Sequence, residues 1–285
     1  MEKLKRYYEL TKPGIIYANV LTAIAGYLFG NKWHVEASSF LGVIVGTSLV
    51  IAGACTYNNV MDRSIDKKMK RTKKRALVTG EISVQNALMY ASVLFLGGLT
   101  TLLLTTNLTV LTIGLIGFVD YVFIYGWAKR HTSLSTIIGS VSGSTSIIAG
   151  YCAATHSFDS DAALLFFILT LWQMPHFYSI AMYRGKDYSA INVPLMPLIR
   201  SANTAKLRIL AYIVAFVSAV ASLTIWGEAG VLSLVILGVL SALWLFKGIK
   251  NYTVEPEKWG KQMFLFSLVV NLGISLAVAI GSVTP

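Results

Sequence analysis

The sequence predicts an all-α integral membrane protein of nine transmembrane helices with a cytoplasmic N-terminus. The chain of 285 residues is 55% hydrophobic and has a mean hydropathy of +0.65, which is too apolar for a soluble domain. Its apolar residues form nine separate stretches, each close to the roughly 20 residues that cross about 30 Å of hydrocarbon. Lys and Arg concentrate in alternate connections between these stretches.

In chain order, the predicted spans are residues 13–29, 38–58, 86–105, 108–127, 134–155, 162–182, 209–226, 231–245 and 263–280. The eighth stretch is the shortest. Short connections, Thr106-Asn107 and Gly227 to Gly230, join the third to the fourth and the seventh to the eighth. The two longest connections, at about 61–85 and 183–208, both lie on the predicted inside.

The positive charges decide the orientation of the spans. If the N-terminus and every second connection are assigned to the inside, Lys32 is the only one of the 24 Lys and Arg residues that lies outside. A wrong number of spans would disturb this alternation. The net charge of +11 is therefore a topology signal, and nucleic-acid binding is not needed to explain it.

The leader has the features of neither a cleavable signal peptide nor an acid-poor transit peptide, because Glu2 and Glu9 precede a long first span. A multi-pass protein of the bacterial cytoplasmic membrane, surrounded by membrane lipid, fits best. Cys55 and Cys152 lack metal-ligand spacing and are interpreted as packing residues. We expect one transmembrane domain over residues 1–285, with cytoplasmic loops at about 61–85 and 183–208 that carry the chemistry.

The first of these loops begins with a regular acidic pattern. Asn58, Asp62 and Asp66 recur every four residues, so they share one face if the second span continues through them as a helix. Carboxylates at the end of a membrane helix repel one another unless a cation holds them together. Oxygen ligands alone point to Mg2+, which commonly completes its shell with water and substrate phosphate.

The residues that follow are strongly basic, with eight Lys and Arg residues from Arg63 to Arg75. Positive-inside charge and anionic-lipid contact account for most of them. They do not account for the spaced Asn and Asp residues. A diphosphate does, because Mg2+ and a few cations together neutralise it and stabilise it as it leaves.

A second polar constellation runs from Trp172 to His176 in the sixth span and continues to Lys186-Asp187-Tyr188. If the helix persists that far, His176 and Asp187 fall within one stripe, and Asp187 becomes the partner of Asp62 and Asp66 across the cavity. The alternative interpretation of Asp187 is a salt bridge to a neighbouring Lys or Arg at a helix end.

The stretch from Asn58 to Arg75 resembles the first Asp-rich motif of the UbiA superfamily of membrane prenyltransferases, in its haem O synthase branch. Thr11-Lys12-Pro13-Gly14, Lys129-Arg130, Trp172 to His176 and Lys186-Asp187-Tyr188 with Pro194 to Pro197 also resemble it, in order along nearly the whole chain. The resemblance implies a nine-helix UbiA-like bundle. The chain departs from the family pattern at Ser144 to Ile147, where the family has a Pro pair in the fifth span. The resemblance therefore does not predict whether this span is kinked there.

What the resemblance implies is Mg2+-dependent transfer of a farnesyl group from farnesyl diphosphate to a vinyl group of protohaem IX, with water addition, giving haem O and diphosphate. Haem A synthase or a terminal oxidase is a candidate partner that would receive the product. The implied residues are Asp62, Asp66, Asp187 and Asn58 around the metal, and Arg71, Arg75, Lys129, Arg130 and Lys186 on the leaving charge.

Histidines are candidates for contact with haem. His176 in the sixth span and His131 beside Lys129 and Arg130 are the better placed, whereas His34 and His156 lie on the outer side. Asp120 lies well inside the fourth span and does not match the family pattern. We interpret it as a protonated or hydrogen-bonded carboxyl and leave it outside the predicted site.

Two other functions compete with this interpretation. A secondary transporter would also have many spans and buried charges, but its ionisable groups lie near the midplane, whereas here the acids cluster at helix ends beside a basic loop. Within the enzyme class, the alternative is a UbiA-type enzyme that prenylates an aromatic quinone precursor. Binding of haem as opposed to a small aromatic acid would separate the two.

Overall fold

The computed structural model describes residues 2–191 and 193–283, and within them every regular element is a helix. Nine helical segments of the described chain are long and apolar enough to cross a membrane, as predicted. They are α2 (Pro13–Gly30), α3 (Ala37–Met61), α6 (Val84–Thr105), Leu108–His131, α9 (Ser135–Thr155), α10 (Ser160–Tyr183), α13 (Ala202–Ile225), α14 (Val231–Lys250) and α15 (Pro256–Gly281). The protein is therefore a multi-pass membrane protein.

The segment Leu108–His131 is not one regular α-helix. It consists of α7 (Leu108–Val119), a single π-helical turn η1 (Asp120–Ile124) and α8 (Tyr125–His131). Short helices lie before the first span and in the loops between later spans. These are α1 (Glu2–Leu10), α4 (Arg63–Asp66), α5 (Ala76–Thr79), α11 (Gly185–Ser189) and α12 (Met196–Ile199).

Several spans extend beyond their predicted bounds. The seventh helix begins at Ala202 and the ninth at Pro256, several residues before the apolar stretches that mark them in the sequence. The second loop is correspondingly shorter than the predicted 183–208. Hydropathy marks only the part of a helix inside the hydrocarbon, whereas the backbone hydrogen bonds continue into the polar region.

Small residues allow the spans to pack closely. Gly26 of α2 and Gly150 of α9 each face the other helix at backbone distance, so that a Cβ atom on either would collide with a carbonyl oxygen, of Ile147 or Ala23 respectively. This close approach is typical of membrane helices, where dispersion contacts replace the hydrophobic effect as the driving force.

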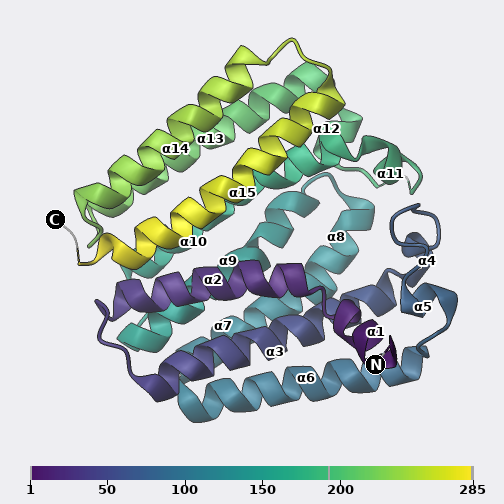
Figure 1. Ribbon diagram of the computed structural model, residues 1–285, viewed down its shortest axis with the longest axis horizontal. Coiled ribbons are helices and arrows are strands. Elements are labelled where there is room, and N and C mark those ends of the chain that lie inside the picture. The colour runs from purple at the N-terminus through teal and green to yellow at the C-terminus, as the bar shows by residue number, and fades with distance from the viewer. Residues whose placement is uncertain (1, 192, 284–285) are drawn as a thin grey trace.

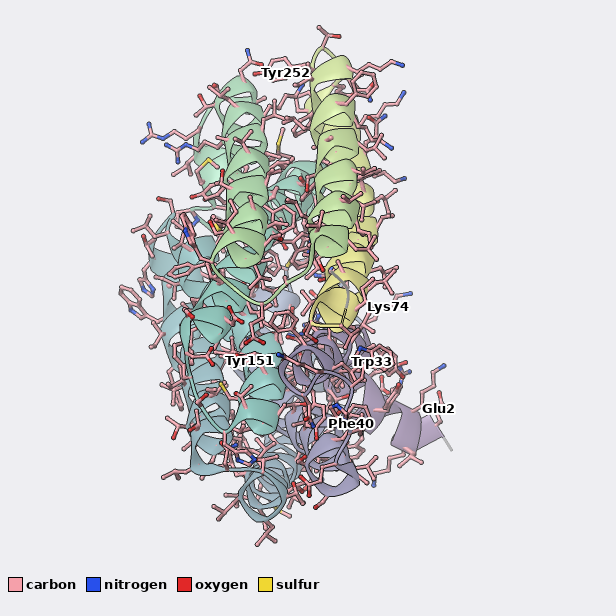
Figure 2. All side chains as sticks on the ribbon, turned by 90° about the vertical axis from the view of Figure 1, so that its left-hand side faces the viewer. Glu2, Trp33, Phe40, Lys74, Tyr151 and Tyr252 are labelled. Carbon is pink, nitrogen blue, oxygen red and sulfur yellow. The ribbon has the colours of Figure 1, made fainter. Side chains whose placement is uncertain are left out.

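The spans form a bundle in which α2 and α15 converge at the left of Figure 1 and diverge toward the right. On one side of the bundle α10, α13, α14 and α15 pack together, and on the other α2, α3, α6, α7 and α9 do. Trp33 and Tyr151 are labelled in Figure 2, which views the bundle from the left-hand side of Figure 1. Trp33 Nε1 donates to the Ala279 carbonyl oxygen at 2.6 Å, and the Tyr151 ring lies 5.9 Å from that of Phe29.

Candidate active site

The two loops predicted to carry chemistry lie at the same end of the bundle, at the right of Figure 1. The first loop contains α4 and α5 and follows α3, and the second contains α11 and α12 and follows α10. Neither span continues as a helix through its motif. The second span ends at Met61 and the sixth at Tyr183. The condition under which each motif would share one helical face, a span that continues through Asp66 or through Asp187, is therefore not met.

Asp62 directly follows the end of α3 and contacts two cations from the end of α8. Lys129 Nζ lies 2.5 Å from Asp62 Oδ2, and Arg130 Nη2 lies 3.2 Å from Asp62 Oδ1. Arg130 also donates to the Met61 carbonyl oxygen at 2.6 Å. The side chains of Asp62 and Lys129 are only 15% and 12% exposed, so these charges are weakly screened by solvent. The first acidic motif, through Asp62, is thus in contact with the predicted cation pair Lys129 and Arg130.

Asp66 is buried and is paired within its own loop. Arg75 Nη1 lies 2.6 Å from Asp66 Oδ2 and 2.9 Å from Asn59 Oδ1, so it joins the loop to the end of α3. Thr72 Oγ1 donates to the Asp66 carbonyl oxygen at 3.0 Å. These hydrogen bonds hold the basic loop against the Asp66 side chain. Among the cations of this loop, Arg75 is the one that pairs with Asp66. Arg71, also predicted for the site, is exposed.

Lys12 is a site residue that the predicted set omits. Its backbone is left-handed, with φ 53°, which is uncommon for a residue other than glycine. This conformation turns the side chain so that Nζ donates to Asn58 Oδ1 at 2.8 Å and lies 3.5 Å from the Tyr121 hydroxyl. Burial lowers the pKa of Lys12 from its ordinary value, and nearby Asp62 is among the groups that oppose the shift. The Thr11 to Gly14 motif was its only signal in the sequence.

Asn58 leaves one buried hydrogen-bonding atom without a protein partner. Its Oδ1 accepts from Lys12, while Nδ2 is fully enclosed and has no acceptor among the described residues. A buried unpaired donor is costly, and a phosphate oxygen is the kind of acceptor that would satisfy it. Asp62 and Asp66 supply the carboxylate oxygens that suit Mg2+.

No group of three or more His, Cys, Asp and Glu side chains within the described ranges is arranged to hold a metal ion. Asp62, Asp66 and Asp187 are thus not gathered into one cluster here. The donor chemistry nevertheless fits Mg2+, because that ion commonly takes only one or two carboxylates and completes its shell from substrate phosphate and water. The predicted ligand set stays a prediction.

The second motif reaches toward the first through Tyr188. Burial raises the pKa of Tyr188, Asp187 adds to the shift, and the positive charges of Arg71 and Arg184 oppose it. Tyr188 therefore lies within electrostatic reach of both loops. Lys186 instead pairs with Glu257 of α15 at 3.1 Å, and its side chain is 90% exposed. Within the described chain, the Asp187 carboxylate has no ion-pair partner, so the salt-bridge alternative does not apply.

Asp120 lies at the start of the π-turn and is 5% exposed. Its Oδ2 accepts a hydrogen bond from the backbone N–H of Ser142 in α9 at 3.0 Å, which agrees with the hydrogen-bonded carboxyl expected from the sequence. In the π-turn the N–H of Tyr125 bonds to the Asp120 carbonyl oxygen, five residues back. Such turns are rare and are frequently found at functional sites.

The departure at Ser144 to Ile147 leaves α9 helical throughout. Ser144 Oγ lies 2.9 Å from Thr170 Oγ1 and accepts from Gln173 Nε2 at 2.9 Å. Ser144 therefore joins α9 to α10. Ser146, which with Ile147 stands where the Pro pair is expected, donates from Oγ to Asn19 Oδ1 of α2 at 3.0 Å, a hydrogen bond that a proline could not make.

The two candidate haem-binding histidines differ in setting. His131 stacks on Trp127 at 4.8 Å, and both side chains are exposed. His176 Nδ1 lies 2.7 Å from Ser267 Oγ, which itself donates to the Phe264 carbonyl oxygen at 2.6 Å. Because that hydroxyl has one proton, Ser267 must accept from Nδ1–H, so the lone pair of His176 is on Nε2.

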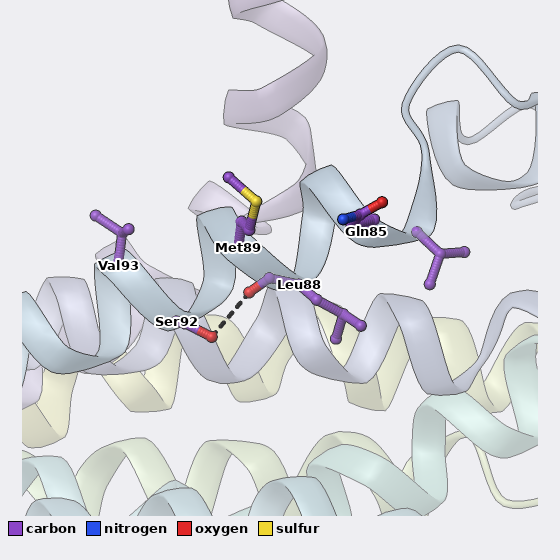
Figure 3. A pocket seen from close by; sticks show the side chains of 6 residues that line it. Gln85, Leu88, Met89, Ser92 and Val93 are labelled. Carbon is purple, nitrogen blue, oxygen red and sulfur yellow. Dashed lines mark hydrogen bonds between the residues drawn. The ribbon is translucent and has the colours of Figure 1, made fainter.

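Two surface grooves lie elsewhere on the bundle. One follows the outer face of α6 and is lined by Gln85, Leu88, Met89, Ser92 and Val93, together with Val84 (Figure 3). The other lies between α7, α9 and α10 and includes Ile116 and Phe166. No predicted site residue lines either groove, and their apolar lining is typical of a lipid-facing surface.

Residues 19–269 match the model of the UbiA prenyltransferase family. The chain is 42% identical over 283 residues to a protein of Klebsiella pneumoniae named protoheme IX farnesyltransferase, covering 99% of this chain and 96% of that protein. A protein of Pectobacterium carotovorum with the same name is 40% identical over 285 residues, with the same coverage.

Solved structures have the same fold. One, described as digeranylgeranylglyceryl phosphate synthase, has a TM-score of 0.81 at 19% identity and covers 99% of both chains. A UbiA homolog from Archaeoglobus fulgidus bound to GPP and Mg2+ has a TM-score of 0.70 at 17% identity, covering 96% of this chain and 99% of that one. The family match and the relatives at 40–42% identity indicate a membrane prenyltransferase, which excludes the transporter interpretation. Because residues 19–269 match the family model and a relative is 42% identical over 99% of the chain, the chain belongs to the UbiA family of membrane prenyltransferases.

Proposed function

We propose that the protein is a protohaem IX farnesyltransferase that converts farnesyl diphosphate, protohaem IX and water to haem O and diphosphate. The observation that carries this proposal is the 42% identity, over nearly the full chain, to a protein of that name. The cation-paired acids Asp62 and Asp66 at the end of the bundle support it. We further propose that residues 1–285 act as one domain in the bacterial cytoplasmic membrane, with both motif loops in the cytoplasm.

The diphosphate would bind between the two loops. Mg2+, when bound, would neutralise the diphosphate charge, with Asp62 and Asp66 as its principal protein ligands and Asp187 and Asn58 completing the predicted set. Lys129, Arg130 and Arg75 already lie against the acids, and Lys12 lies against Asn58. Rearrangement of these cations onto phosphate oxygens would stabilise the departing diphosphate.

In the proposed reaction, the bond between farnesyl C1 and oxygen breaks and its electron pair leaves with the diphosphate. The π electrons of a haem vinyl group then form the new carbon–carbon bond. Water adds to the resulting cation and loses a proton, which gives the hydroxyethylfarnesyl group. The apolar bundle would keep other water away from the allylic cation until the vinyl group reacts.

His176 is the better supported of the two haem-binding candidates. Its Nδ1–H is held by Ser267 and its Nε2 carries a free lone pair, which is the arrangement found in metal-binding histidines. Haem is a substrate in this proposal and not a cofactor. Product transfer to a haem A synthase or a terminal oxidase is the proposed next step.

The test uses the purified, detergent-solubilised protein with Mg2+, farnesyl diphosphate and protohaem, and follows pigments by chromatography and mass. We expect a haem enlarged by a farnesyl unit and one water, absent with chelator and in Asp62→Ala. Glu228→Gln is the matched control, because Glu228 is an exposed acid paired with Lys32 away from both loops. Prenylation of 4-hydroxybenzoate with haem unchanged would move the assignment to the quinone branch.

A further inference from the structure

A column of aromatic rings runs along the contact between α10 and α15. Trp172 stacks on His176 with centroids 4.8 Å apart, and His176 lies 5.3 Å from Phe264. Phe264 in turn stacks with Tyr183 at 6.3 Å. The column therefore starts from the buried Trp172 and ends at Tyr183, the last residue of α10 at the motif end of the bundle.

Two cations meet at the polar end of this column. Arg184 Cζ lies 5.1 Å from the centroid of the Tyr183 ring, and Lys261 Nζ lies 5.6 Å from the same centroid. They come from different elements, the end of α10 and the first turns of α15. Neither has an acidic partner among the described side chains. Glu257, one turn before Lys261, is paired with Lys186 instead.

The orientation of charges across the membrane does not by itself explain this arrangement. The positive-inside rule places Lys and Arg at one end of the spans. It does not explain why two of them converge on one ring at the end of an aromatic column. The chemistry of such a surface is specific. It fits a flat apolar molecule that carries two carboxylates along one edge, because the rings would pack against its body and the cations would pair with its acids.

Protohaem is such a molecule, with two propionates on one edge and two vinyl groups on the other half of the ring. We propose that Arg184 and Lys261 bind the two propionates of protohaem, with the macrocycle against Phe264 and Tyr183 and its iron on the side of His176. This proposal rests on the proposed function and adds the subsite for the acceptor substrate. With the propionates held at the polar end, the vinyl edge points into the bundle, where the prenyl group is transferred.

The contribution of each cation is expected to be moderate, because both side chains are partly solvated. Arg184→Gln and Lys261→Gln remove one charge each and keep most of the side-chain length. We expect each variant to raise the KM for protohaem roughly threefold to tenfold, as for a partly exposed charge pair. The KM for farnesyl diphosphate and the kcat should stay within about twofold of the wild type, since neither residue touches the diphosphate in this proposal.

Protohaem dimethyl ester makes the test specific, because its propionates carry no charge. The wild type should bind protohaem more tightly than the ester in an absorbance titration without farnesyl diphosphate, and the double variant should bind both equally. Lys250→Gln is the matched control, because Lys250 stacks over Phe246 at 5.7 Å on α14 and carries the same charge. It should keep the wild-type preference.

An undiminished preference for protohaem over the ester in the double variant would overturn the subsite. Parallel loss of farnesyl diphosphate affinity would also overturn it, because it would show a general structural role. Lys261→Gln guards against a folding artefact, since that side chain is exposed and can be changed without disturbing the packing. The titration needs no turnover, so absence of any farnesylated haem in the wild type would refute the proposed function separately.

Discussion

Individual side chains of the site are held in charged pairs that span long distances in the sequence. The spacing of Asn58, Asp62 and Asp66 was visible in the sequence because a local motif carries it. Lys12 was missed because its contact with Asn58 joins residues 46 positions apart and depends on a left-handed backbone. Likewise, nothing in the basic run distinguishes Arg75 from its neighbours until the loop folds.

Lys129 offers the sharpest test of a single side chain. Lys129→Met removes the 2.5 Å partner of Asp62 and one cation for the leaving diphosphate. We expect kcat to fall by about 10²-fold to 10³-fold, the usual cost of removing one group that stabilises developing charge. Lys129→Arg restores the charge with different geometry and should recover part of the rate. Full activity of Lys129→Met in steady-state assays would rule out this role.

The ends of α3 and α10 and the π-turn in the fourth span gave no signal in the hydropathy of the sequence. The fourth span is apolar on nearly every face, so the periodicity of its hydrophobic residues could not reveal the π-turn at Asp120–Ile124. The ends of α3 and α10 were also hidden, because helical spacing of polar residues fits both a continuous helix and a broken one. Span number and order were predictable, since hydrocarbon thickness and loop charge determine them directly.

The π-turn predicts a contrast between two substitutions of Asp120. Asp120→Leu removes the hydrogen bond between the π-turn and the Ser142 N–H of α9, and should lower the free energy of unfolding by about 0.5–1.5 kcal/mol. Asp120→Asn keeps an acceptor oxygen and should cost less. Thermal unfolding in detergent would measure both. Equal losses for Leu and Asn would show that the carboxylate charge, and not the hydrogen bond, matters here.

Across the whole molecule, both motif loops lie at one end of the bundle. All the Lys and Arg residues except Lys32 belong to the connections predicted for that end or to the helix turns that adjoin them, whereas Lys32 pairs with Glu228 at the other end. Hydropathy could predict this separation, but not which spans pack together. The pairing of α10 with α15 and of α2 with α9 depends on glycines and ring contacts that become evident only in three dimensions.

The charge separation predicts the orientation of the protein in the cell. Lys74→Cys places a thiol on the exposed surface of the first motif loop, and Ser157→Cys places one on the exposed connection between α9 and α10. The native Cys55 and Cys152 are both buried, so neither should react with a membrane-impermeant maleimide. In intact cells Ser157→Cys should be labelled and Lys74→Cys should not, and permeabilisation should expose the latter. Lys and Arg concentrate in cytoplasmic loops of membrane proteins, so the reverse labelling pattern would contradict the cytoplasmic orientation proposed for both motif loops.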